Sequence, residues 1–171
     1  MFAGWENFYL MIGSAAAGLI GLLFVVATLT GGLGADKAEM GARVYLTPTV
    51  SHFAVVLAAA VVTAVPRLDP WPTAGLIAAT ALWGLGYSAN VARMLHARRG
   101  PVAPHWTDYW CYGYFPGALY LAQIAAAGAL AMGVFWGQDA LAAAMVGLLL
   151  LTIRNAWDLV TSIAPQVNRK P

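Results

Sequence analysis

The chain has 171 residues, of which 61% are hydrophobic and only 9% are charged, and its mean hydropathy is +0.70. Soluble domains carry about one quarter charged residues, and the polar residues here are too few to cover the outer faces of several helices, so the composition excludes an ordinary soluble protein. The single cysteine, Cys111, excludes an intrachain disulfide and leaves no thiolate pair for a metal.

Five apolar stretches approach or exceed the roughly 17–25 residues that cross a bilayer as a helix. They lie at about 8–30, 48–65, 73–95, 116–136 and 140–163. The sequence therefore predicts an all-α fold, a polytopic transmembrane bundle of five helices. It predicts one transmembrane domain over residues 1–171 and no soluble domain.

The first apolar stretch carries small residues that fall largely along one helical face, at Gly13, Ser14, Ala17, Gly18 and Gly21. Small residues spaced by four let helix backbones approach closely in lipid. This face therefore predicts a helix contact. The contact is either packing within one five-helix bundle or a seam between copies of the chain, and the spacing does not separate the two.

An aromatic segment precedes the fourth apolar stretch. Because Pro116-Gly117 is typical of a helix start, residues 105–115 are expected to form a separate segment at the membrane surface. Its tryptophans and tyrosines favour the headgroup region. A stacking surface for a quinone, a pigment or another flat ligand is the alternative.

The basic residues predict the orientation. With five crossings, seven of the nine share one side, Arg67 is alone on the other, and Arg154 is within the membrane. Basic residues in short loops stay cytoplasmic. The N-terminus is therefore expected outside and the C-terminus inside, with a basic rim that attracts anionic lipid headgroups. A nucleic-acid surface would need a larger basic area.

Three segments carry a resemblance. The chain has Trp5-Glu6-Asn7-Phe8, then a small-residue run into Gly21-Leu22-Leu23-Phe24-Val25, and Asn155-Ala156-Trp157 near its end. In these it resembles a group of uncharacterised bacterial five-helix integral membrane proteins. The resemblance covers the two terminal helices and implies a location in the bacterial inner membrane. It implies nothing about chemistry.

Arg154 is the most costly residue of the last apolar stretch, because a guanidinium at mid-bilayer costs about 2.5–3.5 kcal/mol on insertion scales. Asp158, one helical turn further on, is its expected partner. Polar residues at similar predicted depth complete a cluster in the cytoplasmic half of the bundle: Asn155, His52, Asn90, Arg93, Asp108 and Tyr109. This cluster is a structural network, a binding or proton-transfer site open to the cytoplasm, or a lipid-headgroup contact.

The remaining patterns favour a non-catalytic role. No phosphate loop, catalytic triad or paired carboxylates occur, and no two of His52, His96 and His105 share a helix at i, i+4 spacing, so neither a metal site nor a cofactor is predicted. The leading hypothesis is an accessory or interaction subunit that self-associates into a homo-oligomer. A small oligomeric channel or transporter is the alternative, and a membrane enzyme acting on lipid through Asp108, His52 or Asp158 comes third.

Overall fold

The computed structural model describes residues 2, 4–30, 46–66, 69–97 and 105–167. In this part the chain is all-helical, with five long helices and no strand. Four are α1 (Glu6–Thr30), α3 (Thr47–Ala64), α4 (Pro70–Ala97) and α7 (Gly137–Val167). The fifth runs continuously through α5 (Trp106–Asp108), the π-helical turn η2 (Tyr109–Tyr114) and α6 (Phe115–Ala131). The predicted all-α fold is confirmed.

Four of the five helices are long and apolar enough to cross a membrane: Glu6–Thr28, Thr47–Ala64, Trp106–Ala131 and Gly137–Thr161. Helix α4 has 28 residues, so its length suffices. Its second half contains Tyr87, Ser88, Asn90 and Arg93, which lower its hydropathy. The prediction of five spans is therefore supported in part.

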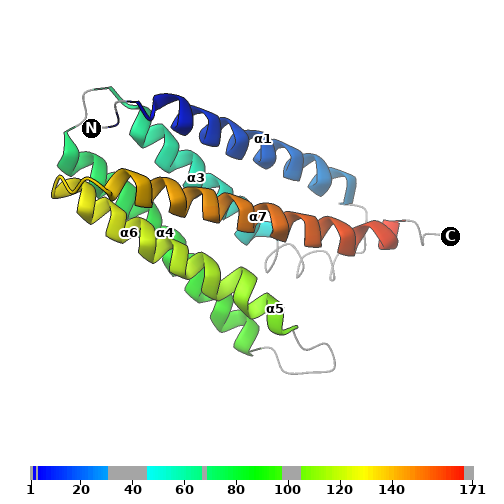
Figure 1. The fold of residues 1–171 in the computed structure, drawn as a ribbon. Coiled ribbons are helices and arrows are strands. Elements are labelled where there is room, and N and C mark those ends of the chain that lie inside the picture. Colours follow the sequence, from blue (N-terminus) through cyan, green and yellow to red (C-terminus); the bar gives the residue numbers. More distant parts are fainter. Residues whose placement is uncertain (1, 3, 31–45, 67–68, 98–104, 168–171) are drawn as a thin grey trace.

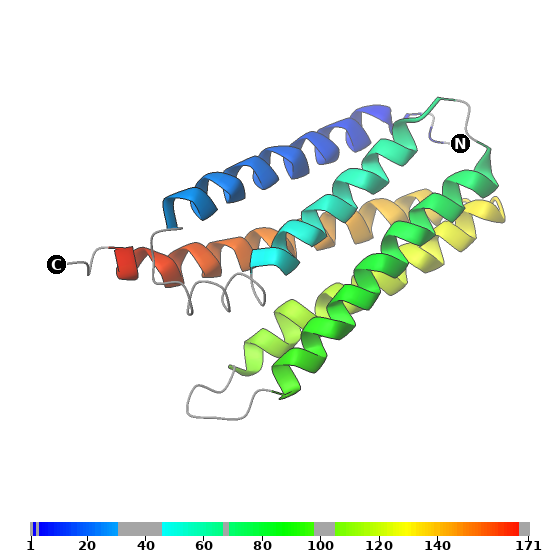
Figure 2. The ribbon, with the colours of Figure 1, turned by 180° about the vertical axis from the view of Figure 1, so that it is seen from behind.

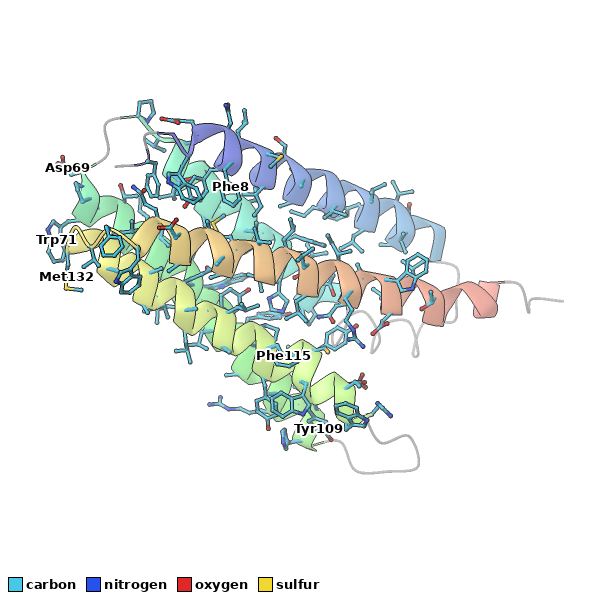
Figure 3. The ribbon with its side chains drawn as sticks, viewed as in Figure 1. Phe8, Asp69, Trp71, Tyr109, Phe115 and Met132 are labelled. Carbon is cyan, nitrogen blue, oxygen red and sulfur yellow. The ribbon has the colours of Figure 1, made fainter. Side chains whose placement is uncertain are left out.

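Successive helices run in opposite directions. One end of the bundle holds the chain's N-terminus, the α3–α4 link and the α6–α7 turn, and we call it the N-terminal end (Figure 1). The other, the C-terminal end, holds the last turns of α4 and α7 and the start of α5. Both views show the α4–α6 pair diverging from α1 and α7 toward the C-terminal end (Figures 1 and 2). Figure 3 places Trp71 and Met132 at the N-terminal end and Tyr109 at the other.

Glycines set the closest helix contacts. A Cβ built on Gly13 of α1 would lie 2.9 Å from the Ala60 Cβ of α3, and one on Gly147 of α7 would lie 2.9 Å from a Leu119 methyl of α6. Any larger residue would force the neighbour to shift, because real Cβ atoms essentially never come so near, and the Ala60 Cβ, fixed to its backbone, has less freedom to do so than the Leu119 methyl. The buried core formed around them is rich in alanine and aliphatic residues.

Two predicted boundaries are wrong. Helix α6 ends at Ala131, not at 136, because Gly133 adopts φ +70° and the Gly133 and Val134 N–H groups bond back to the Leu130 and Ala129 carbonyls. This left-handed glycine motif is a common helix stop. Residues 106–115 are not a separate surface segment either. They continue into α6 as the first turns of the same helix, and Pro116 is accommodated in the interior of that helix because the π-helical turn η2 before it is wider than an α-helical turn.

Most of the loop residues used to predict orientation lie outside the described residues. These are Lys37, Arg43, Arg67, Arg98, Arg99, Arg169 and Lys170. The described basic residues are Arg93 and Arg154, both on the C-terminal half of their helices.

Candidate functional site

The first polar region is built around the π-helical turn η2. Pro116 is the cause of this turn. A proline ring clashes with the carbonyl four residues earlier, and it has no N–H to bond that carbonyl. The turn before it is widened, so the Phe115 N–H bonds the Trp110 carbonyl, five residues back, and not that of Cys111. The Cys111 carbonyl is thereby free for a partner outside the helix.

Asn155 of α7 is the hydrogen-bond partner of that carbonyl. Its Nδ2 donates to the Cys111 carbonyl oxygen at 2.8 Å, and the Tyr112 hydroxyl donates to the Asn155 main-chain oxygen at 3.1 Å. Asn155 is 0% exposed and Tyr112 is 3% exposed, whereas Cys111 is of intermediate exposure, so the Tyr112 bond is buried and the Cys111 bond is partly buried. Two hydrogen bonds therefore join α7 to the π-turn.

Arg154 completes this region. Its guanidinium donates to the Asn155 Oδ1 at 3.2 Å and lies 2.8 Å from an Asp158 carboxylate oxygen. The structure thus brings together three residues that the sequence grouped, Arg154, Asn155 and Asp158. The side chains of the ion pair are 42% and 44% exposed, so the pair lies at the edge of the bundle and not deep inside it. We call Arg154, Asn155, Asp158, Cys111 and Tyr112 the Asn155 clamp.

The structure places four other predicted site residues elsewhere. Asn90 and Arg93 are exposed on α4, and the Asn90 amide faces the Met94 sulfur at 4.0 Å. Asp108 closes a helix-capping box with the His105 main chain at 3.1 Å. The Tyr109 hydroxyl reaches the Leu95 carbonyl at 3.4 Å. Asp108 thus caps the start of α5, and Tyr109 bonds the last turn of α4.

His52 belongs to a second polar region, nearer the middle of the bundle. Its Nδ1 lies 2.6 Å from the Tyr120 hydroxyl of α6, and both side chains are 0% exposed. A Cβ on Gly84 of α4 would lie 2.3 Å from the Tyr120 Cζ, so the ring occupies the space that any other residue would fill. Along the α6 helix, Tyr120 is about 12 Å from Tyr112 of the clamp at 1.5 Å per residue.

Hydrogen bonding around His52 is incomplete among the described residues. The His52 Nε2, the Ser88 Oγ and both amide atoms of Gln123 are buried without a hydrogen-bond partner. Ser88 follows Gly84 by one turn on α4, and Gln123 follows Tyr120 by one turn on α6. We call these five residues, His52, Gly84, Ser88, Tyr120 and Gln123, the His52 layer.

Tyr120 and Gln123 were missed by the reasoning from sequence. A signal for Gln123 existed, because it is the one amide in a run of alanines and aliphatic residues between 118 and 131. Tyr120 gave no such signal, since tyrosine is common in apolar helices. The clamp's bond to Cys111 involves a main-chain carbonyl. Because every residue type has one, this bond could not be predicted from residue types.

Only part of the predicted small-residue face of α1 is buried in the structure. Gly13 is buried against α3, whereas Ser14, Ala17, Gly18 and Gly21 are exposed. A Cβ on either Gly18 or Gly21 would meet no heavy atom of the described residues within 4 Å, apart from the backbone of its own helix. Packing within the bundle therefore uses Gly13, together with Tyr9, Ile12 and Ala16. The other small residues lie on the outer surface of α1.

An apolar groove runs between α3 and α4. It is lined by Ala54, Val55, Ala58, Ala79, Thr80 and Trp83. The Thr80 hydroxyl already donates to the Ile77 carbonyl at 2.8 Å, so it is engaged within its own helix. The groove therefore offers an apolar surface for contact with hydrocarbon. None of its lining residues belongs to either polar region. Within the described residues, no three His, Cys, Asp or Glu side chains gather as metal ligands would.

Comparisons with known proteins identify no relative. The chain matches no protein-family model, no curated protein and no solved structure. Its function is therefore argued from its own residues.

Proposed function

We propose that the chain is an integral membrane protein of the bacterial inner membrane that crosses the bilayer five times, with its N-terminal end outside and its C-terminal end in the cytoplasm. Four helices qualify as spans by length and composition. Helix α4 packs along both α3 and α6, so it lies within the same slab as its two apolar neighbours. Of the polar residues on α4, Ser88 is buried inside the bundle, and the exposed Asn90 and Arg93 lie in the last turns of the helix, toward the inner interface.

Five exposed tryptophans near the two ends of the bundle support this placement, whereas a sixth, Trp83, is exposed near the middle of α4. Trp71 and Trp136 are exposed at the N-terminal end, and Trp106, Trp110 and Trp157 are exposed toward the other. Along α7, Trp136 and Trp157 are separated by about 31 Å at 1.5 Å per residue, which matches a hydrocarbon thickness of about 30 Å. Tryptophan is enriched at both membrane interfaces.

This placement changes the expected depth of Arg154. The residue lies within one turn of Trp157, close to the inner interface, where the polar half of its side chain reaches water or lipid headgroups. The ion pair's exposure of 42% and 44% accords with that position. The His52 layer, in contrast, falls in the apolar interior between the two tryptophan belts.

We infer that the protein acts as a non-catalytic accessory or interaction subunit, and the Asn155 clamp is the observation that carries this inference. Its charged and amide groups are bonded to one another and to the π-turn, so they hold α7 against the rest of the bundle. A reactive group would instead be left open to a substrate.

The exposed small residues of α1 provide the surface for association in this proposal. Helix α1 packs mainly along α3, and Ser14, Ala17, Gly18 and Gly21 face outward. To test this association, the protein is labelled with donor and acceptor dyes and reconstituted in liposomes. Energy transfer between the dyes is then measured at decreasing protein-to-lipid ratios. Transfer that persists on dilution and is lost in Gly18→Leu supports a homo-oligomer. Transfer that falls in proportion to dilution, as for a non-associating membrane protein, argues against one.

An oligomeric channel or transporter is the second candidate, favoured by the polar His52 layer in the middle of the bundle. Toward the N-terminal end, the buried residues beyond this layer are largely apolar, including Ile77, Leu130 and Leu141. The buried Thr63 and Thr73 hydroxyls there already donate to the main-chain carbonyls of Ala60 and Asp69. A path through one bundle would end there, so transport would have to use a path between copies. Proteoliposome flux that disappears in Arg154 or Asp158 variants would replace the first proposal with this one.

A further inference from the structure

Four buried polar atoms in the His52 layer lack a partner among the described residues: His52 Nε2, Ser88 Oγ and the two amide atoms of Gln123. The three side chains are 0%, 1% and 0% exposed, respectively. Native interiors leave few polar groups unpaired, and those that remain indicate strain, a functional role or a bound molecule. Their number within one layer of this bundle calls for a common explanation.

The three side chains come from different helices but lean toward the same level. Helical side chains tilt toward the N-terminus of their own helix. Helix α6 begins at the C-terminal end of the bundle, so Gln123 leans back toward Tyr120. Helix α4 begins at the opposite end, so Ser88 leans back toward Gly84. Since Gly84 contacts the Tyr120 ring and Tyr120 contacts His52, both tilts bring the free polar groups toward the His52–Tyr120 pair.

The hydrogen-bonding capacity of the layer follows from the chemistry of these groups. The Tyr120 hydroxyl has no other acceptor among the described residues, so its proton is best used as a donor to the His52 Nδ1, which leaves an N–H at Nε2. Gln123 offers two N–H donors and a carbonyl acceptor, and Ser88 offers one of each kind. A molecule held here must donate and accept hydrogen bonds at the same time.

The charge and size of that molecule are also restricted. None of the described buried residues is Asp, Glu, Lys or Arg, so an ion would be buried without a counter-charge. Ala81 on α4 and Ala126 on α6, each about one turn from members of the layer, are fully buried. The core is therefore closed close to the layer, which limits the size of the molecule. We propose that the His52 layer binds a small, uncharged molecule with both donor and acceptor groups, for which water and a small amide are the two sources. This site is separate from the Asn155 clamp and does not depend on the clamp's role.

Cysteine reactivity tests whether the layer is hydrated. Two cysteine variants, Gln123→Cys and Leu141→Cys, are compared in full-length Cys111→Ser protein in detergent. Leu141 is the control because it is 0% exposed, lies in the apolar part of the core and has a side chain of similar size. Polar sites hold water and apolar cavities stay dry, so we expect a small methanethiosulfonate reagent to label Gln123→Cys at least about tenfold faster. Equal and slow labelling of the two variants would overturn the proposal.

The melting temperature gives a test that does not require a new thiol. Gln123→Met keeps the side-chain size and removes the polar atoms. If a bound molecule satisfies the amide, the melting temperature falls. If the amide is buried dry and unpaired, removing it raises the melting temperature, which would contradict the proposal. Leu148→Met, also at 0% exposure, controls for methionine itself.

Acetamide distinguishes the two sources in the same labelling experiment. Slower labelling of Ser88→Cys in the Cys111→Ser background as acetamide is added identifies a small amide as an occupant. Labelling that is fast and unaffected by acetamide identifies water.

Discussion

The Asn155 clamp and the His52 layer are both polar regions of one apolar bundle, the clamp partly exposed at its edge and the layer buried, and they differ in how completely their groups are bonded. In the clamp, the Asn155 side chain has partners for both its donor and its acceptor, and Tyr112 bonds the adjacent main chain. In the layer, Gln123 has none among the described residues. A satisfied network rigidifies a structure, whereas unpaired buried groups are costly unless something binds them. The clamp therefore suits a structural role and the layer suits a binding role.

The largest effect is expected from Gly84→Leu, because the Tyr120 ring already fills the space beside Gly84. Overpacking of a core costs about 1–3 kcal/mol and occasionally more, and a leucine here would also displace Tyr120 from His52. We expect little folded protein in detergent, measured by size-exclusion yield. Gly86→Leu is the control, since no heavy atom lies within 4 Å of its Cβ position. Equal yields for the two variants would show that the ring does not pack as described.

Next in size are two tyrosine substitutions that compare the regions directly. Tyr120→Phe removes the bond to His52 and leaves a further buried nitrogen unpaired, whereas Tyr112→Phe removes a bond to a main-chain carbonyl. Interhelical hydrogen bonds in membranes average about 0.6 kcal/mol and reach about 1.7 kcal/mol. We expect Tyr120→Phe near the upper value and Tyr112→Phe near the average, measured by unfolding in SDS. The reverse order would mean that the His52–Tyr120 bond contributes less than the clamp.

A smaller effect is expected when the ion pair is broken. Exposed pairs contribute about 0.2–1 kcal/mol, and the Arg154 and Asp158 side chains are 42% and 44% exposed. Arg154→Ala should lower the free energy of unfolding by that amount, and Asp158→Asn should cost less in the Arg154→Ala background than alone. A loss well above this range would place the pair deeper in the membrane than its exposure indicates.

The smallest effect on folding is expected at Gly18. Gly18→Ala fills open space on the surface of α1, whereas Gly13→Ala would press a methyl group against Ala60. Unfolding in SDS should show no loss for Gly18→Ala and a clear loss for Gly13→Ala. Similar losses at both positions would contradict the division of this face into a buried and an exposed part.

Periodicity and composition predicted the parts of the fold that depend on local properties. The five helices follow from apolar length, and the Arg154–Asp158 contact follows from i, i+4 spacing. The end of α6 was missed because Gly133 was overlooked as a left-handed stop in an apolar run.

The candidate site was predicted less well, because depth along different helices cannot be compared from sequence alone. His52 was grouped with Arg154 since each lies in the half of its helix nearer the C-terminal end. However, α3 has only 18 residues and α7 has 31, so the two helices do not end at the same level and counts from their ends do not give a common depth. The bond between Asn155 and Cys111 also depends on the π-turn that Pro116 imposes, which residue spacing does not reveal.

The central claim is that the Asn155 clamp holds the bundle together, and one measurement tests it most directly. The free energy of unfolding in SDS is compared for Asn155→Leu and Asn90→Leu, the same change at a buried asparagine bonded through both amide atoms and at an exposed one on α4. Leaving the partly buried Cys111 carbonyl unpaired should cost Asn155→Leu about 1–3 kcal/mol, with little change for Asn90→Leu. An Asn155→Leu protein as stable as the Asn90→Leu protein would contradict the claim.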